Sequence, residues 1–265
     1  MLYYEKILNQ NSNQWVLFIH GLGGSSRTWK YQIDKFSKGY NILLVYLDGH
    51  GKSNDQILES KYKPTSTAQS IEKVLEYENI SKVHIVSLSL GTLVALEFTR
   101  LYYHRVESLI LAGGIINLTL SRQFVFKVAN FTTKHFPKNF AYNIFAHIIM
   151  PKQHHKKSRE IFIREAKLLN GNMFKKWVEC VGIANNRLKE YIKVLVKNHI
   201  PTLFISGKED YMFLNGIKDI CRKIKMFKVD IIEESGHVCS IERADTFNKI
   251  ALNFIDQTSP IPNMT

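Results

Sequence analysis

Short apolar runs alternate with longer amphipathic stretches along most of the chain. Six runs are rich in Val, Ile and Leu and lack polar alternation; they span residues 15–20, 41–47, 82–88, 106–112, 200–206 and 227–232. Strands that are covered on both faces have this character. Helical patterns lie between the runs, at residues 26–36, 65–77, 90–103, 214–223 and 240–255. The alternation predicts right-handed crossovers and a doubly wound, mostly parallel sheet of the α/β class, with residues 2–8 as a candidate antiparallel edge strand.

The alternation is interrupted between residues 116 and 197. About eighty residues separate two core strands here, which is too many for a plain loop in a compact domain. The segment carries helical patterns at 158–169 and 174–195 and is rich in aromatic residues. We therefore predict a core formed by residues 1–115 and 198–265, with a helical lid inserted at 116–197. Most of the aromatic rings are expected to pack the lid, and a few to line a substrate pocket.

The net charge of +13 is concentrated in that same segment. Residues 121–197 hold 16 Lys and Arg against 4 Glu and no Asp, whereas the remainder is nearly balanced. A field of this sign favours anionic ligands or anionic membrane surfaces. The alternative is that these lysines only solvate exposed helix faces.

Several protein classes are disfavoured by composition. No apolar run reaches the roughly 18–20 residues that span a bilayer. Residues 1–14 lack the layout of a secretory signal, so we expect a cytoplasmic location. The three cysteines, Cys180, Cys221 and Cys239, lack the spacing of a disulfide framework or a zinc site.

The sharpest local motif is Ser87-x-Ser89-x-Gly91, at the end of the predicted strand 82–88. A nucleophilic serine on a tight strand-to-helix turn needs small residues two positions on either side, and the usual pattern is G-x-S-x-G. Here Ser87 replaces the first glycine. Ser89 is the preferred nucleophile because it has a small residue two positions before it and glycine two positions after it.

A serine hydroxyl needs a neighbouring base, and that base needs an orienting group. His237 follows the last predicted strand, and Asp210 follows the strand before it in the turn Gly207-x-x-Asp210. Both positions lie where a parallel sheet places its ligand crevice. We predict His237 as the base and Asp210 as the acid; Glu209 is the weaker candidate for the acid.

The tetrahedral oxyanion of acyl transfer requires donors that already point at it. The backbone N–H of Leu90, next to the nucleophile, is one candidate, and that of Leu22 in the glycine-rich stretch 20–24 is the other. Glycines allow the backbone to approach a substrate closely. The stretch lacks the Lys-Ser/Thr ending of a phosphate loop and the spacing of a dinucleotide fingerprint.

Taken together, these motifs resemble the α/β-hydrolase superfamily, in the capped serine-hydrolase branch. The resemblance covers residues 15–112 and 200–255. It rests on His20-Gly21 with Gly23-Gly24, Asp48-Gly-His-Gly-x-Ser53, Ser87-x-Ser89-x-Gly91, Gly207-x-x-Asp210 and Ser235-Gly236-His237. The order Ser, Asp, His along the chain is that of the fold.

The resemblance implies that Ser89 attacks an acyl carbon, His237 shuttles the proton and Asp210 fixes the imidazole, without a metal or organic cofactor. The lid should set specificity. We expect a small ester, thioester or lipid-like substrate with an apolar acyl part and an anionic portion. Because this fold hosts many chemistries, cleavage of carbon–carbon bonds or elimination of carboxylates, as in menaquinone biosynthesis, remains an alternative.

Three further interpretations concern what the protein binds. One is a member of the fold that binds a small ligand or partner protein for signalling. Such a protein would not need a Ser-His-Asp triad, so the presence of these three residue types argues against it. A nucleic-acid binder is not expected, since no binding motif accompanies the basic segment. Peripheral membrane contact through the lid is compatible with basic residues above an apolar helix face.

Overall fold

The computed structural model describes residues 1–53, 64–116, 131 and 135–259. They form a seven-stranded sheet in the order β1-β3-β2-β4-β5-β6-β7. The strands are β1 (Tyr4–Ile7), β2 (Trp15–Ile19), β3 (Asn41–Val45), β4 (Val83–Leu88), β5 (Val106–Ala112), β6 (Thr202–Gly207) and β7 (Phe227–Ile232).

The pairing of the strands confirms the predicted fold class. β1 pairs antiparallel with β3, and every other neighbouring pair is parallel. Each of the six predicted apolar runs overlaps a strand of the sheet. The central strands are buried along their whole length because both faces are covered, which is why their sequences show no polar alternation.

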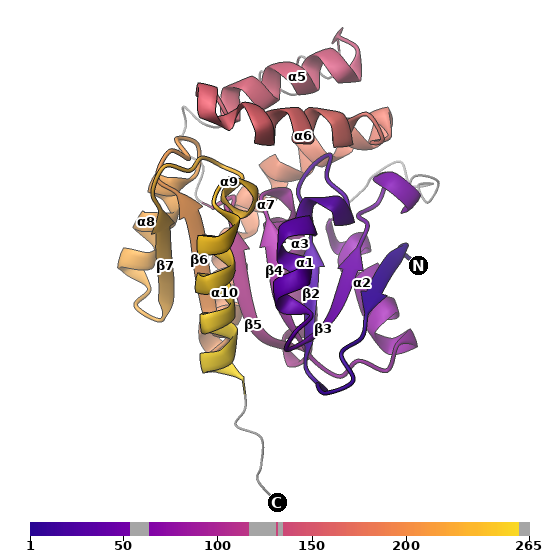
Figure 1. Cartoon of the computed structure of the whole chain (residues 1–265), viewed down its shortest axis with the longest axis vertical. Helices are drawn as coiled ribbons and strands as arrows, with labels where there is room; N and C mark the ends of the chain where they lie inside the picture. Colours follow the sequence, from indigo (N-terminus) through magenta and orange to yellow (C-terminus); the bar gives the residue numbers. More distant parts are fainter. Residues whose placement is uncertain (54–63, 117–130, 132–134, 260–265) are drawn as a thin grey trace, which may run out of the picture.

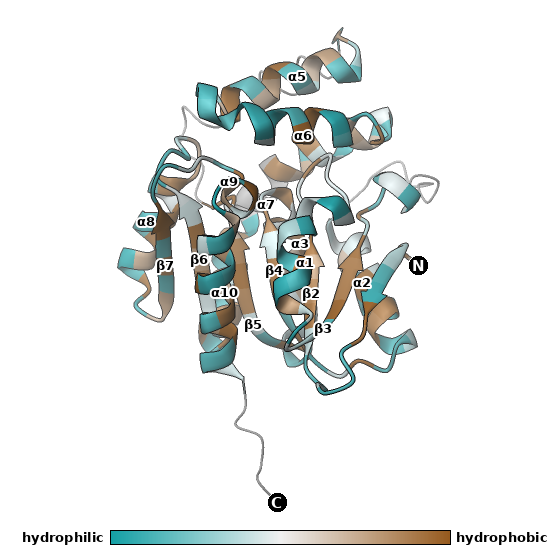
Figure 2. Cartoon of the chain, viewed as in Figure 1, coloured by the Kyte–Doolittle hydropathy of each residue, from teal (hydrophilic) through white to brown (hydrophobic). Residues whose placement is uncertain are grey.

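Helices cover both faces of the sheet (Figure 1). α1 (Lys30–Phe36) and α10 (Ala244–Thr258) contact each other in front of it, and α2 (Pro64–Tyr77) and α3 (Leu90–Tyr102) contact each other behind it. α8 (Leu214–Lys223) packs against β6 and β7. Figure 2 shows apolar strands between helices whose outward faces are hydrophilic.

Two predicted helices are each divided in the structure. The stretch 26–36 begins with a 3-10 turn, η1 (Ser26–Trp29), because Ser25 caps that turn before α1 starts. The stretch 240–255 is split at Arg243, whose φ of −134° and ψ of 56° are not helical. This break separates the short helix α9 (Cys239–Glu242) from α10.

Between β5 and β6 the chain forms α5 (Lys138–Ile149), η4 (Gln153–His155), α6 (Lys156–Ala166) and α7 (Gly171–Lys197). α5 and α6 lie above the edge of the sheet at which the parallel strands end (Figure 1). Residues 117–130 and 132–134 of the predicted lid lie outside the described residues. We refer to the described part of this segment, residues 135–197, as the insertion.

α7 also belongs to the body of the protein. It packs on α3, and the guanidinium of Arg187 lies 3.0 Å from the fully buried carboxylate of Glu97. Arg100 of α3 lies 2.9 Å from the same carboxylate, so two arginines neutralise the buried charge. The contact with Arg187 joins the C-terminal half of α7 to α3, while α5 and α6 lie above the edge of the sheet.

Among the helices of the described residues, none combines the length and the apolar character needed to cross a bilayer.

Candidate active site

Ser89 occupies the turn between β4 and α3, at the centre of the sheet. Its backbone has φ 52° and ψ −119°, a left-handed conformation that a side chain rarely adopts. The conformation is held by two hydrogen bonds: the Ser89 N–H donates to the carbonyl of Ala112 at 2.9 Å, and the Thr92 N–H donates to the carbonyl of Ser89 at 2.8 Å. Strain of this kind clusters at functional sites. The Ser89 side chain therefore stands above the end of the sheet.

Ser87 lies on the strand and faces a different way. Its side chain is fully buried, and its hydroxyl donates to the carbonyl of Ile110 on β5 at 3.1 Å. That hydroxyl is part of the packing between β4 and β5. The Ser87 hydroxyl therefore bonds within the sheet, whereas the Ser89 hydroxyl lies beside His237.

Gly91 is required by the approach of β2 to the start of α3. A Cβ atom at this position would lie 2.4 Å from the carbonyl oxygen of Ile19 and 2.6 Å from that of His20. Both are backbone atoms, so no side chain can move aside. The glycine two residues after Ser89 is therefore fixed by packing beneath the turn.

His237 is brought to Ser89 by the loop that follows β7. The Ser89 hydroxyl oxygen lies 2.8 Å from His237 Nε2, and the imidazole is buried with 1% of its surface exposed. The ring packs against Phe213 at a centroid distance of 5.0 Å. On another side it lies over Gly113, where a Cβ atom would come within 3.0 Å of it. These contacts hold the ring in one orientation.

Asp210 completes the arrangement from the loop after β6. Its Oδ2 lies 2.9 Å from His237 Nδ1, and its Oδ1 accepts the N–H of Phe213 at 3.1 Å. A carboxylate can only accept, so Nδ1 carries the proton and Nε2 is free to accept from the Ser89 hydroxyl. The three predicted side chains, which are remote in sequence, therefore lie in one hydrogen-bonded row.

The turn that carries Asp210 packs tightly against the loop that carries His237. A Cβ atom on Gly207 would lie 2.2 Å from the carbonyl oxygens of both Ser235 and Gly236. Glu209, the weaker candidate for the acid, points away: its carboxylate contacts Lys152, His154 and His155 of the insertion. The structure therefore places Asp210, and not Glu209, beside the imidazole.

The glycine-rich loop 20–24 passes directly beside Ser89. A Cβ atom on Gly21 would lie 3.3 Å from the Cβ of Ser89, and Gly23 has φ 72°. Leu22 lies in this loop, and Leu90 is the first residue of α3. A first helical residue has no carbonyl of a preceding turn to bind its N–H. Both predicted donors are thus on the segments that flank Ser89.

Two buried histidines hold this loop through their ring nitrogens. His20 Nε2 accepts the N–H of Leu47 at 3.1 Å, and His50 Nε2 accepts the N–H of Gly23 at 2.9 Å. Because a backbone N–H can only donate, both rings are neutral and carry their proton on Nδ1. Burial lowers the pKa of His20 to about 4 and that of His50 well below its usual value. The sequence motif Asp48-Gly-His-Gly-x-Ser53 did not reveal this role of His50.

Tyr142 of α5 is a second residue that the sequence did not reveal. Its hydroxyl donates to the carbonyl of Leu22 at 2.7 Å, and it lies so close to Gly23 that a Cβ atom there would meet the phenol oxygen at 2.5 Å. Burial raises the pKa of Tyr142 well above its usual value, so the phenol remains a donor. The only signal in the sequence was one aromatic residue among many in the insertion.

A comparison with known protein families matches most of the chain. A family model described as the alpha/beta hydrolase fold matches residues 14–244. The chain belongs to the α/β-hydrolase fold family. As a member of that family it is a hydrolase, and the match includes Ser89, Asp210 and His237 as well as the insertion.

Individual relatives are distant but cover nearly the full length. A Bacillus subtilis protein named as a 2-succinyl-6-hydroxy-2,4-cyclohexadiene-1-carboxylate synthase is 21% identical over 92% of this chain and 91% of its own. A 2-hydroxy-6-oxononadienedioate/2-hydroxy-6-oxononatrienedioate hydrolase of Klebsiella pneumoniae is 24% identical over 91% of this chain and 86% of its own.

Among solved structures, one from work on carboxylesterases of Nitrososphaera gargenis superposes with a TM-score of 0.83. It is 18% identical to this chain and covers 97% of it, and the match extends over 94% of its own length. At this identity the likeness shows the fold.

Proposed function

We propose that the protein hydrolyses carboxylic ester or thioester bonds through a covalent acyl-enzyme on Ser89. The observation that carries this proposal is the row of two hydrogen bonds, 2.8 Å from Ser89 to His237 and 2.9 Å from His237 to Asp210. Nucleophile, base and orienting acid at hydrogen-bonding distances are the recognised signature of nucleophilic catalysis by serine.

In the first half-reaction, Ser89 Oγ attacks the acyl carbon while its proton passes to His237 Nε2. The resulting imidazolium is stabilised by the carboxylate of Asp210 at Nδ1. The carbonyl oxygen of the substrate becomes an oxyanion, for which the N–H groups of Leu22 and Leu90 are the proposed donors. His237 then returns the proton to the leaving alcohol or thiol as the carbon–oxygen or carbon–sulfur bond breaks.

The second half-reaction repeats the sequence with water as the nucleophile. His237 takes a proton from water, hydroxide adds to the acyl carbon, and the acid is released as Ser89 regains its proton. Every proton that leaves one group is accepted by another in these steps. They require only side chains and backbone groups of this chain.

Charge in the insertion bears on the substrate. Most of the net charge of the chain lies in residues 121–197, and the described lysines of α6 and α7 belong to that segment. A cationic approach to the site raises the local concentration of anionic ligands. We therefore propose a substrate with an apolar acyl part and an anionic portion.

A second candidate reaction uses the same residues. The relatives from B. subtilis and K. pneumoniae are named for the synthesis of a carboxylate and for the hydrolysis of dienedioates. Those names favour carbon–carbon bond cleavage or carboxylate elimination on an anionic substrate, and the basic insertion suits that class equally. A third candidate function is ligand binding without turnover. It would not explain why Ser89, His237 and Asp210 are joined by hydrogen bonds.

The experiment that tests the proposal is a substrate panel at several ionic strengths. p-Nitrophenyl esters of increasing chain length, thioesters, and neutral and anionic esters of equal length are compared with a dienone acid. Turnover of esters, with a preference for anionic ones that fades as salt screens the field, is the expected result. Turnover of the dienone acid alone would assign the second candidate, and the absence of all turnover would favour ligand binding.

We also propose that α5 gives the protein contact with an anionic membrane surface. Phe140 and Ile148 of α5 are exposed at 52% and 40%. Phe136, which precedes the helix, is exposed at 45%, and its ring packs on Phe140 at a centroid distance of 5.3 Å. Exposed apolar side chains in a strongly basic segment are typical of a surface that contacts anionic lipid.

A further inference from the structure

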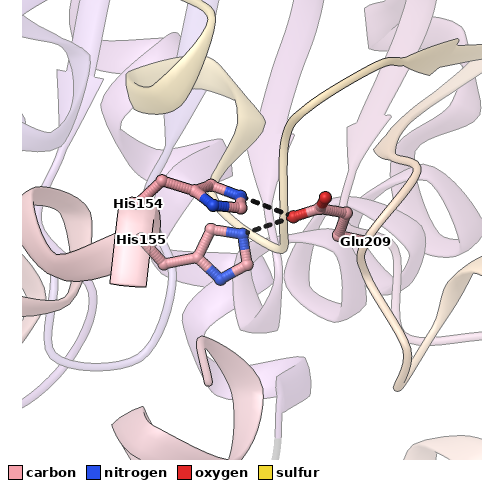
Figure 3. Close-up of side chains that lie close together, drawn as sticks. All are labelled: His154, His155 and Glu209. Atoms are coloured by element: carbon pink, nitrogen blue, oxygen red, sulfur yellow. Dashed lines mark hydrogen bonds and ion pairs between the residues drawn. The ribbon is translucent and has the colours of Figure 1, made fainter. Parts of the chain in front are cut away.

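Among the described residues, one group of three side chains has the composition and spacing of a metal site. It consists of His154, His155 and Glu209, whose potential ligand atoms all lie within 4.8 Å of one another. Figure 3 shows both imidazole rings directed at one carboxylate oxygen. His154 Nε2 lies 2.6 Å from Glu209 Oε2, and His155 Nε2 lies 3.0 Å from the same atom.

The three residues come from different parts of the fold. The histidines form the end of η4 in the insertion, and Glu209 lies in the loop after β6, next to Asp210. A metal ion bound by all three would join the insertion to the core next to Asp210. From this arrangement we propose that His154, His155 and Glu209 bind one divalent transition-metal ion of the zinc class, outside the hydrolytic reaction.

The ligand set fits such an ion better than a hard cation. Imidazole nitrogens suit zinc and its neighbours, whereas calcium and magnesium prefer oxygen ligands. Zinc–nitrogen and zinc–oxygen distances near 2.1 Å place tetrahedral ligand atoms about 3.4 Å apart. The observed separations of 2.6 and 3.0 Å must therefore widen when the ion enters, the first of them more than the second. His154 can provide that movement because half of its side chain is exposed.

The ring of His155 can lie where it does both with and without a bound metal ion. It is fully buried, and its Nδ1 has no hydrogen-bond partner among the described residues. When Nε2 donates to Glu209, Nδ1 is an unsatisfied acceptor; when Nε2 binds a metal, Nδ1 becomes an unsatisfied donor. Either tautomer has an orphaned nitrogen, so metal binding adds little further penalty there.

A polar surface cavity and a nearby carboxylate favour a cation at this site, whereas a nearby lysine opposes it. His154 lines a surface cavity of about 220 Å³ together with Glu234 and Glu242, which gives an ion a polar route of entry. Glu242 Oε2 lies 3.9 Å from His155 Nε2 and adds negative charge. Against this, Lys152 Nζ lies 2.7 Å from Glu209 Oε1. Since that lysine is 41% exposed, its ammonium can turn towards solvent.

The ammonium of Lys152 thus competes with a metal ion for Glu209. Removing it should change the metal affinity in a direction that depends on whether the three residues bind a metal. If the three residues bind a metal, removing the ammonium must tighten binding, because it removes a repulsive charge. If they form only an ionic contact between insertion and core, removing it must loosen that contact and produce no metal site. Lys152→Met separates the two readings.

The experiment uses the full chain carrying Cys221→Ser, so that this partly exposed thiol cannot bind the ion. Metal-free protein is titrated with zinc chloride in a calorimeter and with cobalt chloride in a spectrophotometer. We expect one ion per chain, a dissociation constant in the micromolar range, visible cobalt bands and a rise in Tm. Calcium and magnesium should produce none of these.

Variants locate the ion. His154→Ala and Glu209→Gln should each weaken zinc binding at least ten-fold, and Lys152→Met should tighten it several-fold. The matched control is His147→Ala, an exposed histidine on α5 that should leave the affinity unchanged. Zinc binding that His154→Ala does not weaken, or no zinc binding by the unaltered cluster, would overturn the proposal. Ester turnover by metal-free protein reports separately on the hydrolytic site.

Discussion

The hydroxyl of Tyr142 donates a hydrogen bond of 2.7 Å to the carbonyl of Leu22, and through it a helix of the insertion holds the loop beside Ser89. Trp177 of α7 makes a similar link, since its Nε1 donates to the carbonyl of Asp48 at 3.0 Å. The insertion is therefore coupled to the backbone around Ser89 as well as placed above it. In the proposed mechanism these contacts position the Leu22 N–H for the oxyanion.

Replacing Tyr142 with Phe tests that coupling. The variant leaves the Leu22 carbonyl buried without its donor, which costs about 1–3 kcal/mol of stability. Removing one oxyanion donor outright lowers kcat by about 100- to 1000-fold, so a displaced donor should lower it by about 10- to 100-fold. KM should change little, because the lost contact acts on the transition state. Steady-state kinetics and urea unfolding measure the two effects.

The control for this variant is Tyr77→Phe, at a tyrosine that is 69% exposed on α2. It should change neither kcat nor stability. A Tyr142→Phe enzyme with an unchanged kcat would mean that the loop is held without the phenol. A rise in KM alone would instead assign Tyr142 to substrate binding.

Gly91→Ala tests the packing beneath the nucleophile turn. Its methyl group would press on the carbonyl oxygens of Ile19 and His20, so α3 and Ser89 must shift. Overpacking of this kind costs about 1–3 kcal/mol. We expect that loss in urea unfolding and a loss of most of the activity. Gly39→Ala is the matched control, because nothing lies within 4 Å of its Cβ position; equal effects of the two changes would contradict the account.

Stability should fall as the pH is lowered from about 6.5, the ordinary pKa of histidine, towards 4. Burial lowers the pKa of both His20 and His84 to about 4. In this window the unfolded state binds protons that the folded state does not, so each histidine removes about 1.4 kcal/mol per pH unit. Stability from these groups is complete above pH 6.5 and lost progressively below it.

The measurement is the free energy of unfolding in urea between pH 7 and 4.5. His84→Asn should reduce the slope of that dependence by about 1.4 kcal/mol per pH unit. His104→Asn, at an exposed histidine, should leave the slope as it is. Parallel curves for the His84 variant and the parent protein would refute the assignment.

Membrane contact through α5 is tested by co-sedimentation with vesicles. Vesicles rich in phosphatidylglycerol should retain the protein, and vesicles of phosphatidylcholine should not. Replacing Phe136 and Phe140 with Ser should reduce the bound fraction at least several-fold, since both exposed aromatic rings are lost. Tyr77→Ser, at an exposed aromatic residue outside the insertion, is the control. No binding to anionic vesicles at physiological salt would end this proposal.

The sheet and the approach of three remote side chains to one another can be predicted from the sequence for physical reasons. Strands buried on both faces need unbroken apolar runs, so the positions of β3 and β4 can be predicted from the sequence. Ser89, Asp210 and His237 follow such runs directly, and strand ends meet at one edge of a parallel sheet. Convergence of the three side chains could therefore be predicted.

Contacts between the insertion and the core could not be predicted in this way. Tyr142 and Glu209 each meet a partner more than fifty residues away, and no periodicity fixes which face of α5 or of η4 points inward. The division of the last predicted helix at Arg243 was equally hidden, because it depends on one pair of backbone angles. Local pattern shows where elements form, whereas long-range packing decides which side chains meet.

The most direct test of the central claim is labelling with a fluorophosphonate, followed by mass spectrometry of the modified peptide. We predict a single adduct on Ser89, lost together with turnover in Ser89→Ala and retained in Ser87→Ala. An adduct on Ser87, or substantial turnover by Ser89→Ala, would contradict the assignment of the nucleophile.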